Sequence, residues 1–408
     1  MALWRRETNL WPEPGQTLIV RFSLTFAAKV KIRALSTEDL EDMVLGATIL
    51  STGGGGSPST ALKTAGSIER KGIKPRIVDP KDLKKNALVF SPGDFGGGIS
   101  KEEEERFEQV YKAKIPIKWA KWPLKMWSSA SVKELAKHLG RKPDVYLSSE
   151  LGPGAFMGVI EQAAEAGKPM IDGDTVGRAV PDATMSLLAL KKVEMVGGVS
   201  TSHFGDVIVW KRVADLRRLE DIGRAFSTAS GGGIGMAVAY NWRKAKKAVI
   251  PKTLSKCISL GKKARESKGG EGKTLATILK ETMGRVLFKG RITDVKNDSK
   301  HGHLYGEYLI DGSGDYAGHN FRIWFKNENH VGWKDAKPVI SSPDTITVYD
   351  PEIKQGLWNW DKTPQDHEIY VLGIPCQPVW RTAKGLELLG PSAFGFDFHY
   401  TPVESLPS

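Results

Sequence analysis

The sequence predicts an α+β protein of two domains, with an N-terminal α/β layered domain over residues 32–195 and a largely β domain with a few helices over residues 196–405. Three observations lead to this prediction. The chain has 408 residues, which is enough for two domains of ordinary size. Short apolar runs alternate with helical segments in the first half, as is typical of an α/β layer. Beyond about residue 286, short β-like runs are separated by Gly, Asp-Gly, Asn and Pro.

The first expected helix spans residues 37–48, because Ser36 and Asp39 form an S-x-x-D capping box and apolar residues then recur at helical spacing. Ser57 as N-cap and Pro58 at the first helical position start a second helix, which runs to about residue 71. The remaining expected elements of this domain are strands at 76–78, 87–90, 145–147 and 169–171 and helices at 101–112 and 155–166.

The second domain begins with a strand-like segment and three helical ones, at 204–212, 213–226, 252–267 and 273–283. Five β-like runs follow: LFKGRITDV (287–295), EYLIDG (307–312), FRIWF (321–325), DTITVYD (344–350) and EIYVLGIP (368–375). Five of the twelve tryptophans lie beyond residue 286, in or near these runs, which suits a sheet that packs on one face.

The composition indicates a soluble globular protein, with 40% hydrophobic and 26% charged residues. No apolar run approaches the roughly 18 residues that a membrane span needs. The two cysteines, Cys257 and Cys376, make neither a disulfide framework nor a paired metal motif, so a reducing cytoplasm is the expected compartment. Residues 1–31 lack the pattern of a signal peptide, and we expect them to be a poorly ordered extension.

The net charge of +12 comes mostly from residues 241–268, which hold ten Lys and Arg against one Glu. Within this stretch apolar residues recur at helical spacing, so we expect an amphipathic helix with a solvated basic face. An anion or nucleic-acid surface is the less favoured alternative, because no aromatic residues interleave with the charges.

Four consecutive glycines, Gly53, Gly54, Gly55 and Gly56, join the first two expected helices. Glycine lets the backbone approach a ligand closely, and the helix that follows offers unpaired N–H groups and a positive dipole end. We therefore expect this loop to bind an anionic or polar oxygen of a substrate. A tight turn between helices is the alternative.

Three further glycine-rich loops follow predicted strands and carry carboxylates. PGDFGGG (92–98) contributes Asp94, SSELGPG (148–154) contributes Glu150, and DGDTVGRAVPD (172–182) is the most heavily charged. Loops at the carboxyl ends of strands are where open α/β sheets usually build a site. We expect the four loops to share one cleft above the sheet.

In the fourth loop, Asp172 or Asp174 could act as general base or metal ligand, and Arg178 could hold an anionic oxygen with two hydrogen bonds. Asp182 is interpreted as the cap of a helix that starts in ATMSLLAL. These assignments place the chemistry on Asp172, Asp174, Arg178 and Glu150.

The histidines give weak signals. His301 and His303 on a strand would face the same side, but two ligands do not make a zinc site, and a solvent-facing pair is favoured. His203 is a better candidate for a ligand or base. Cys257 lies on the apolar face of its helix, and Cys376 could supply a thiolate near the cleft.

Several segments, in their order along the chain, resemble the S-methyl-thiohydantoin desulfurase family, whose members are often associated with hydantoinase and oxoprolinase proteins. The segments are ALSTEDLEDMVLGATILSTGGGGSP (34–58), PGDFGGGISKEE (92–103), SSELGPG, DGDTVGRAVPD, LFKGRITDV, KNENH (326–330), SSPDTITVYD (341–350) and GPSAFGFDFHYTPV (390–403). The resemblance spans residues 32–403 and implies an α/β domain followed by a largely β domain.

The resemblance also implies a hydrolase that removes sulfur from a five-membered cyclic amide or thioamide, with Asn327, Glu328 and Asp344 as further site residues. A zinc ion would suit this chemistry, but its ligands are not assigned. The alternative is a non-catalytic subunit or ligand-binding module that works with a hydantoinase-like protein or with a second copy of the chain. We expect a small-molecule substrate, no membrane partner and no nucleic acid.

Overall fold

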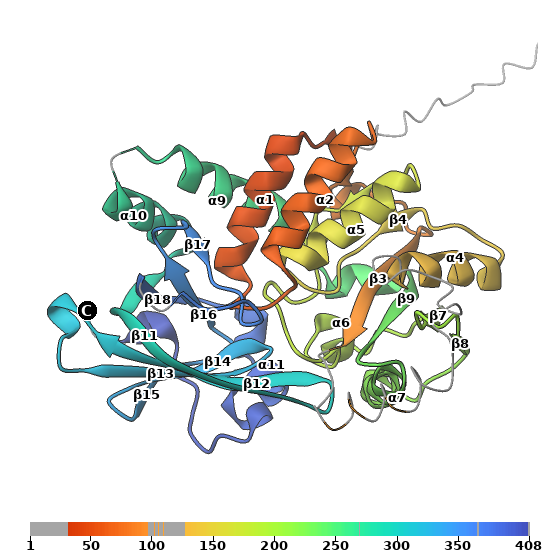
Figure 1. The fold of residues 1–408 in the computed structure, drawn as a ribbon. Coiled ribbons are helices and arrows are strands. Elements are labelled where there is room, and N and C mark those ends of the chain that lie inside the picture. The colour runs from red at the N-terminus through yellow and green to blue at the C-terminus, as the bar shows by residue number, and fades with distance from the viewer. Residues whose placement is uncertain are drawn as a thin grey trace, which may run out of the picture. The chain divides into compact units, whose positions relative to one another are not determined.

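The computed structural model describes residues 32–96, 102, 105, 109, 127–268, 270–364 and 367–406. The extension expected over residues 1–31 lies outside this part, and the helix expected over residues 101–112 lies outside it but for three isolated residues. The described part combines a mixed sheet covered by helices with a second, antiparallel sheet, in agreement with the predicted fold class (Figure 1).

The first sheet has the order β1-β2-β5-β4-β3-β9-β7-β8 within the described residues. Its strands are β1 (Ile32–Ala34), β2 (Arg76–Val78), β3 (Leu88–Gly96), β4 (Val145–Tyr146), β5 (Met170–Ile171), β7 (Gly197–Thr201), β8 (Val207–Trp210) and β9 (Gly233–Asn241). The four central strands β2, β5, β4 and β3 are parallel, and β9 pairs with β3 in the antiparallel sense over nine residues. The carboxyl ends of the parallel strands therefore meet at one edge.

Helices cover both faces of this sheet. They are α1 (Thr37–Leu50), α2 (Pro58–Arg70), α4 (Trp127–Leu139), α5 (Pro153–Glu165), α6 (Leu187–Leu190), α7 (Leu216–Ala229) and α8 (Trp242–Ala245). The helix α9 (Thr253–Glu266) packs against α1, and α10 (Glu271–Thr282) packs against α9. One apolar core lies between the sheet and α1, α2, α4, α5 and α9, and the other lies towards α6, α7 and α8. The Ser36 capping box and the start of α2 after Ser57 are confirmed.

The crossing of α1 and α9 depends on small residues. A β-carbon on Gly46 would overlap the backbone of Cys257, and one on Gly261 would overlap the backbone of Asp42. Cys257 is fully buried, so its expected place in the core is confirmed. Three basic residues of α9 form ion pairs: Lys262 with Glu266, Lys263 with Glu281, and Arg265 with Asp42.

The second sheet has the order β15-β14-β13-β12-β11-β18-β16-β17, and its paired strands are antiparallel. Its strands are β11 (Arg285–Lys300), β12 (His303–Gly312), β13 (Asn320–Lys326), β14 (Glu328–Lys334), β15 (Lys337–Ser341), β16 (Thr345–Asp350), β17 (Gln355–Gly356) and β18 (Glu368–Ile374). Alternating apolar residues of these strands form a third core, and the short helix α11 (Ala383–Leu389) follows the sheet.

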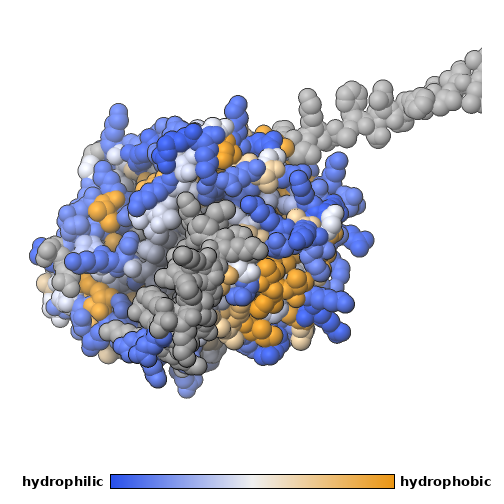
Figure 2. Space-filling view, turned by 45° about the vertical axis from the view of Figure 1, so that its right-hand side comes forward, coloured by the Kyte–Doolittle hydropathy of each residue, from blue (hydrophilic) through white to orange (hydrophobic). Residues whose placement is uncertain are grey.

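The chain places β7, β8 and β9 in the first sheet although they follow residue 196, and the predicted boundary at 195 stays a prediction. A two-stranded sheet of β6 (Gly173–Asp174) and β10 (Ile250–Pro251) adds a further contact to this layer. None of the described helices is long and apolar enough to span a membrane. Among the coloured residues in Figure 2 most are hydrophilic, and the apolar ones form one large patch and several smaller ones.

Candidate active site

A cavity of about 490 Å³ lies where the four glycine-rich loops meet the second sheet. Its lining includes residues of all four loops and of the β13–β14 turn: Gly55, Gly56, Asp94, Glu150, Thr175, Asp182, Asn327 and Glu328. The structure thus brings the four predicted segments together around one cleft. The prediction that PGDFGGG is a loop is wrong for residues 92–96, because they continue β3 and pair with β9. Of the predicted site residues, Gly53, Gly54, Asp172, Asp174 and Arg178 do not line this cavity.

The four consecutive glycines have two different surroundings. Gly53 and Gly54 pack against the second sheet, since β-carbons there would overlap the side chains of Asn359 and Glu328. Gly55 and Gly56 line the cavity and also pack against the backbone of the SSELGPG loop. These close approaches explain why the run holds glycine at every position. Binding of a substrate oxygen by this loop stays a prediction.

Glu150 reaches the cavity from the loop between β4 and α5. Its Oε2 accepts a hydrogen bond of 2.8 Å from the backbone N–H of Val180. Burial raises the pKa of Glu150 to about 7, and the charge of Asp174 adds to the rise. A carboxyl group with such a pKa is partly ionised at neutral pH, which suits a general base.

Glu328 enters the same cavity from the second sheet. Asn327 precedes it with a positive φ of 58° in the turn from β13 to β14, and its Oδ1 accepts a hydrogen bond from the N–H of Leu304. Glu328 is only 3% exposed, and its Oε2 has no hydrogen-bond partner among the described residues. Burial raises the pKa of Glu328 well above its ordinary value, and the charge of Glu150 raises it further. Burial therefore favours the neutral, protonated form of the Glu328 carboxyl group.

Asp94 is a third carboxyl group that lines the cavity. Burial raises its pKa to about 6, while hydrogen bonds from Ser128 oppose the rise. Tyr240 on β9 also lines the cavity, and burial raises the pKa of its hydroxyl group, which stays neutral. Sequence reasoning missed Tyr240, although the alternation of large and small residues along GIGMAVAYN was a signal.

The side chains of Asp172 and Asp174 form hydrogen bonds within the protein and do not line the cavity. Asp172 accepts hydrogen bonds from the N–H and the hydroxyl group of Ser255, at 3.0 and 2.7 Å, and so supports the first turn of α9. Asp174 is fully buried, and its Oδ1 accepts hydrogen bonds from the backbone N–H groups of Val176 and Gly177, each of 2.6 Å. Burial raises the pKa of Asp174 to about 6. Their catalytic roles stay predictions.

Arg178 is 2% exposed and links the fourth loop to the second sheet. Its guanidinium group makes five hydrogen bonds, to the backbone oxygens of Ala179, Asn329, Pro343 and Asp344 and to the hydroxyl group of Ser342. Burial lowers the pKa of Arg178 to about 10, which still leaves it charged. With its donors used in this way, Arg178 positions the loop, and its predicted contact with a substrate oxygen is untested. The carboxylate of Asp344 accepts hydrogen bonds from the backbone N–H groups of Cys376 and Val403 and from the hydroxyl group of Tyr400.

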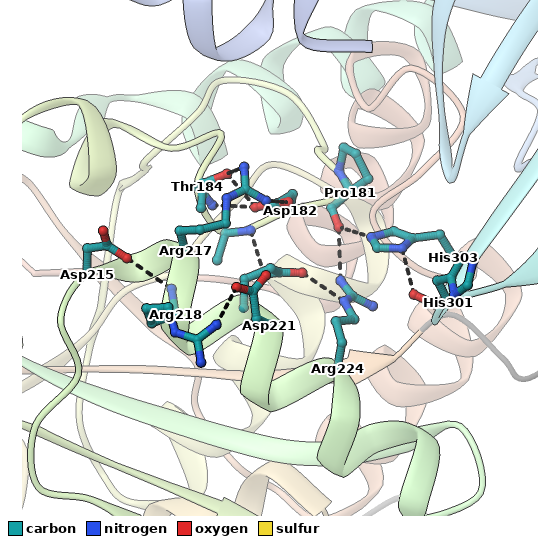
Figure 3. Close-up of polar contacts among 12 residues, drawn as sticks. Pro181, Asp182, Thr184, Asp215, Arg217, Arg218, Asp221, Arg224, His301 and His303 are labelled. Carbon is teal, nitrogen blue, oxygen red and sulfur yellow. Dashed lines mark hydrogen bonds and ion pairs between the residues drawn. The ribbon is translucent and has the colours of Figure 1, made fainter. Parts of the chain in front are cut away.

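A polar network on α7 borders the cavity (Figure 3). Arg224 bonds to Glu220 at 2.7 Å and to the carbonyl oxygens of Pro181 and Gly302. Asp182 pairs with Arg217 at 3.0 Å.

The prediction that Asp182 caps the next helix is wrong. That helix, α6, begins at Leu187, and Ser186 is its N-cap. Asp182 instead accepts the N–H of Thr184 in a local turn, because its carboxylate lies too early in the chain to reach the helix.

The histidine and cysteine candidates from the sequence do not line the cavity. His301 is in a turn with positive φ, while His303 is buried against the carbonyl oxygen of Pro181, so they do not form a pair. Burial raises the pKa of Cys376 to about 12, so it is a thiol and not the expected thiolate. Neither His203 nor Cys376 lines the cavity.

No group of three or more His, Cys, Asp or Glu among the described residues could hold a metal ion, so the donor set that zinc would require is not assembled there. Five of the ten basic residues of the stretch 241–268 form ion pairs with other described residues. Lys244, Lys252 and Arg265 form ion pairs with Glu194, Asp79 and Asp42.

Two family models match the chain. One is described as S-Me-THD-like, N-terminal domain, and covers residues 38–212, and the other is described as S-Me-THD-like, C-terminal domain, and covers residues 214–403. No curated protein matches the chain. Among solved structures, a protein from Chromobacterium violaceum is similar, with 21% identity and a TM-score of 0.71 over 91% of this chain and 100% of that chain. This similarity supports the fold alone.

Proposed function

The chain belongs to the S-Me-THD-like family, and from this we propose that it hydrolyses the carbon–sulfur bond of a thiohydantoin-like five-membered ring, leaving a hydantoin-like product. One observation carries the proposal. Two carboxyl groups, Glu150 and Glu328, enter one cavity from different sheets, and burial raises the pKa of Glu150 to about 7 and that of Glu328 well above its ordinary value. Paired carboxyls whose pKa values differ can divide the roles of base and acid between them.

In the proposed reaction, the ionised form of Glu150 takes a proton from a water molecule that attacks the ring carbon bearing sulfur. The new carbon–oxygen bond forms, the carbon–sulfur bond breaks, and its electron pair leaves with sulfur. Glu328 gives its proton to the departing sulfur. From an S-alkyl ring a thiol is released, and the proton of the new hydroxyl group moves to the ring nitrogen to leave the carbonyl group of the product. From a thione that hydroxyl proton goes to sulfur as well, so that hydrogen sulfide is released. Glu150 then returns its proton to Glu328, which restores both groups.

The lining offers further support for this reaction. Gly55 and Gly56 bring their backbone to the cavity just before α2, where the helix dipole favours negative charge on the attacked ring. Trp358 and Trp360 also line the cavity and offer flat faces to a planar ring. No step depends on a metal ion.

The experiment is an assay of released thiol or sulfide with S-methyl-thiohydantoin and thiohydantoin, with and without a chelator. Glu150→Gln and Glu328→Gln should each lower kcat by about 100-fold or more, which is typical of a lost general base or acid. Glu165→Gln, which removes an exposed carboxyl group on α5, is the control and should keep full activity. Thermal stabilisation by ligand without any turnover would favour a binding module instead.

A further inference from the structure

We propose that the substrate ring carries a bulky apolar substituent, aromatic or branched aliphatic, that packs against one wall of the cavity. This inference rests on the proposed function, because it assumes that the ring binds near Glu150 and Glu328. We call this surface the apolar wall. It consists of Leu188, Leu216, Leu219, Met236, Val238 and Tyr240.

The apolar wall is built on regular elements. Met236, Val238 and Tyr240 are alternate residues of β9 and so face the same side of the first sheet. Leu216 and Leu219 come from the first turn of α7. All six side chains belong to one packed apolar cluster or contact it, so the wall exists before any ligand binds. A preformed apolar surface loses little order on binding.

The size of the cavity exceeds what a bare ring needs. A thiohydantoin ring has about seven non-hydrogen atoms, whereas cavities of roughly 300–1,000 Å³ usually enclose drug-sized ligands. The present cavity measures about 490 Å³, so a ring at the carboxyl groups leaves space beside it. The apolar wall borders the same space, and an apolar group there would displace water from apolar surface.

The charged residues nearby disfavour an acidic substituent. Arg224 lines the cavity, but its Nε, Nη1 and Nη2 already donate to Glu220, Gly302 and Pro181. Arg217 is paired with Asp182 and Thr184. Within the described lining, a carboxylate on the substrate would therefore meet Asp94, Glu150 and Glu328, while the cation there, Arg224, is already bonded to Glu220.

The experiment compares three S-methyl-thiohydantoins, in which carbon 5 carries hydrogen, a benzyl group or a carboxyethyl group. We expect kcat/KM for the benzyl compound to be roughly 100-fold higher than for either of the others. Val238→Phe, which fills the apolar wall, should reduce this preference at least tenfold. Val209→Phe, on the exposed edge strand β8, is the matched control and should leave the preference unchanged.

Calorimetric binding of 5-benzylhydantoin and 5-carboxyethylhydantoin to the wild-type protein separates the possible outcomes. Equal turnover of all three compounds would overturn the inference while leaving the proposed function intact. If none is turned over, the proposed function fails. Tighter binding of the benzyl compound would then still support the apolar wall, and equal or tighter binding of the carboxyethyl compound, or binding of neither, would overturn it.

Discussion

Replacing Glu150 by Gln should make the protein more stable at alkaline pH while removing the proposed base. Burial raises the pKa of Glu150 from its ordinary value of 4.5 to about 7, which means that the protein holds the charged form at a cost in free energy. An amide carries no charge, and its oxygen can still accept the hydrogen bond from Val180. Gain of stability and loss of activity from one substitution is the expected mark of a functional site.

The magnitude follows from the pKa. One pKa unit corresponds to about 1.4 kcal/mol, so a rise from 4.5 to about 7 corresponds to roughly 3 kcal/mol. Glu150 is partly accessible from the cavity, and solvent screening reduces the expected gain to about 1–2 kcal/mol. Between pH 4.5 and 7 the folded protein binds this proton more tightly than the unfolded chain does. Wild-type stability therefore falls as pH rises through this window and levels off above it.

The assay is unfolding in guanidinium chloride at pH 5 and pH 8.5. The midpoint of Glu150→Gln should exceed that of the wild type at pH 8.5 by clearly more than at pH 5. Glu165→Gln, the exposed control, should differ from the wild type equally at both pH values. A lower stability of Glu150→Gln than of the wild type at pH 8.5 would mean that the folded protein stabilises the charged carboxylate. The conclusion that burial raises the pKa of Glu150 would then be wrong.

Gly54→Ala should push Glu328 from its place and lower turnover at least tenfold, whereas Gly158→Ala, which meets no atom within 4 Å, should keep activity and stability. Arg178→Ala should lower the melting temperature strongly and cost roughly 3 kcal/mol or more of the free energy of unfolding, because it removes five buried hydrogen bonds. An unchanged melting temperature would show that these bonds are not needed. Asp172→Asn should weaken the start of α9 by about 1 kcal/mol and retain turnover; loss of turnover at unchanged stability would restore its catalytic role.

The fold class and most elements of the first domain could be predicted because their signals are local. The capping box at Ser36 and the Ser57-Pro58 start depend on neighbouring residues alone, and both are present. Sequence reasoning missed β9, although it is the partner of β3 along its full length. Its segment follows a glycine loop and contains Gly and Ala, which have low strand propensity, and only burial between two helical layers makes it a strand.

Part of the site was also predictable, and part was not. Glycine-rich loops after parallel strands indicated a shared cleft, because strand direction brings such loops to one edge. Within the most charged loop, however, the sequence could not distinguish residues that face the cavity from residues that bond to the protein. Asp172 bonds to α9 and Arg178 to the β14–β16 segments, contacts made over more than 80 and 150 positions of chain.

The sequence by itself determined which residues could do chemistry and that their loops would gather at one edge of a sheet. Only the tertiary structure decided which of them became chemically distinctive. Glu150 and Glu328 are ordinary carboxylates in the sequence, and their pKa values rise because folding buries them in one cavity. The energy of a charge depends on the medium and on the charges around it, and both are set by contacts between segments far apart in the chain.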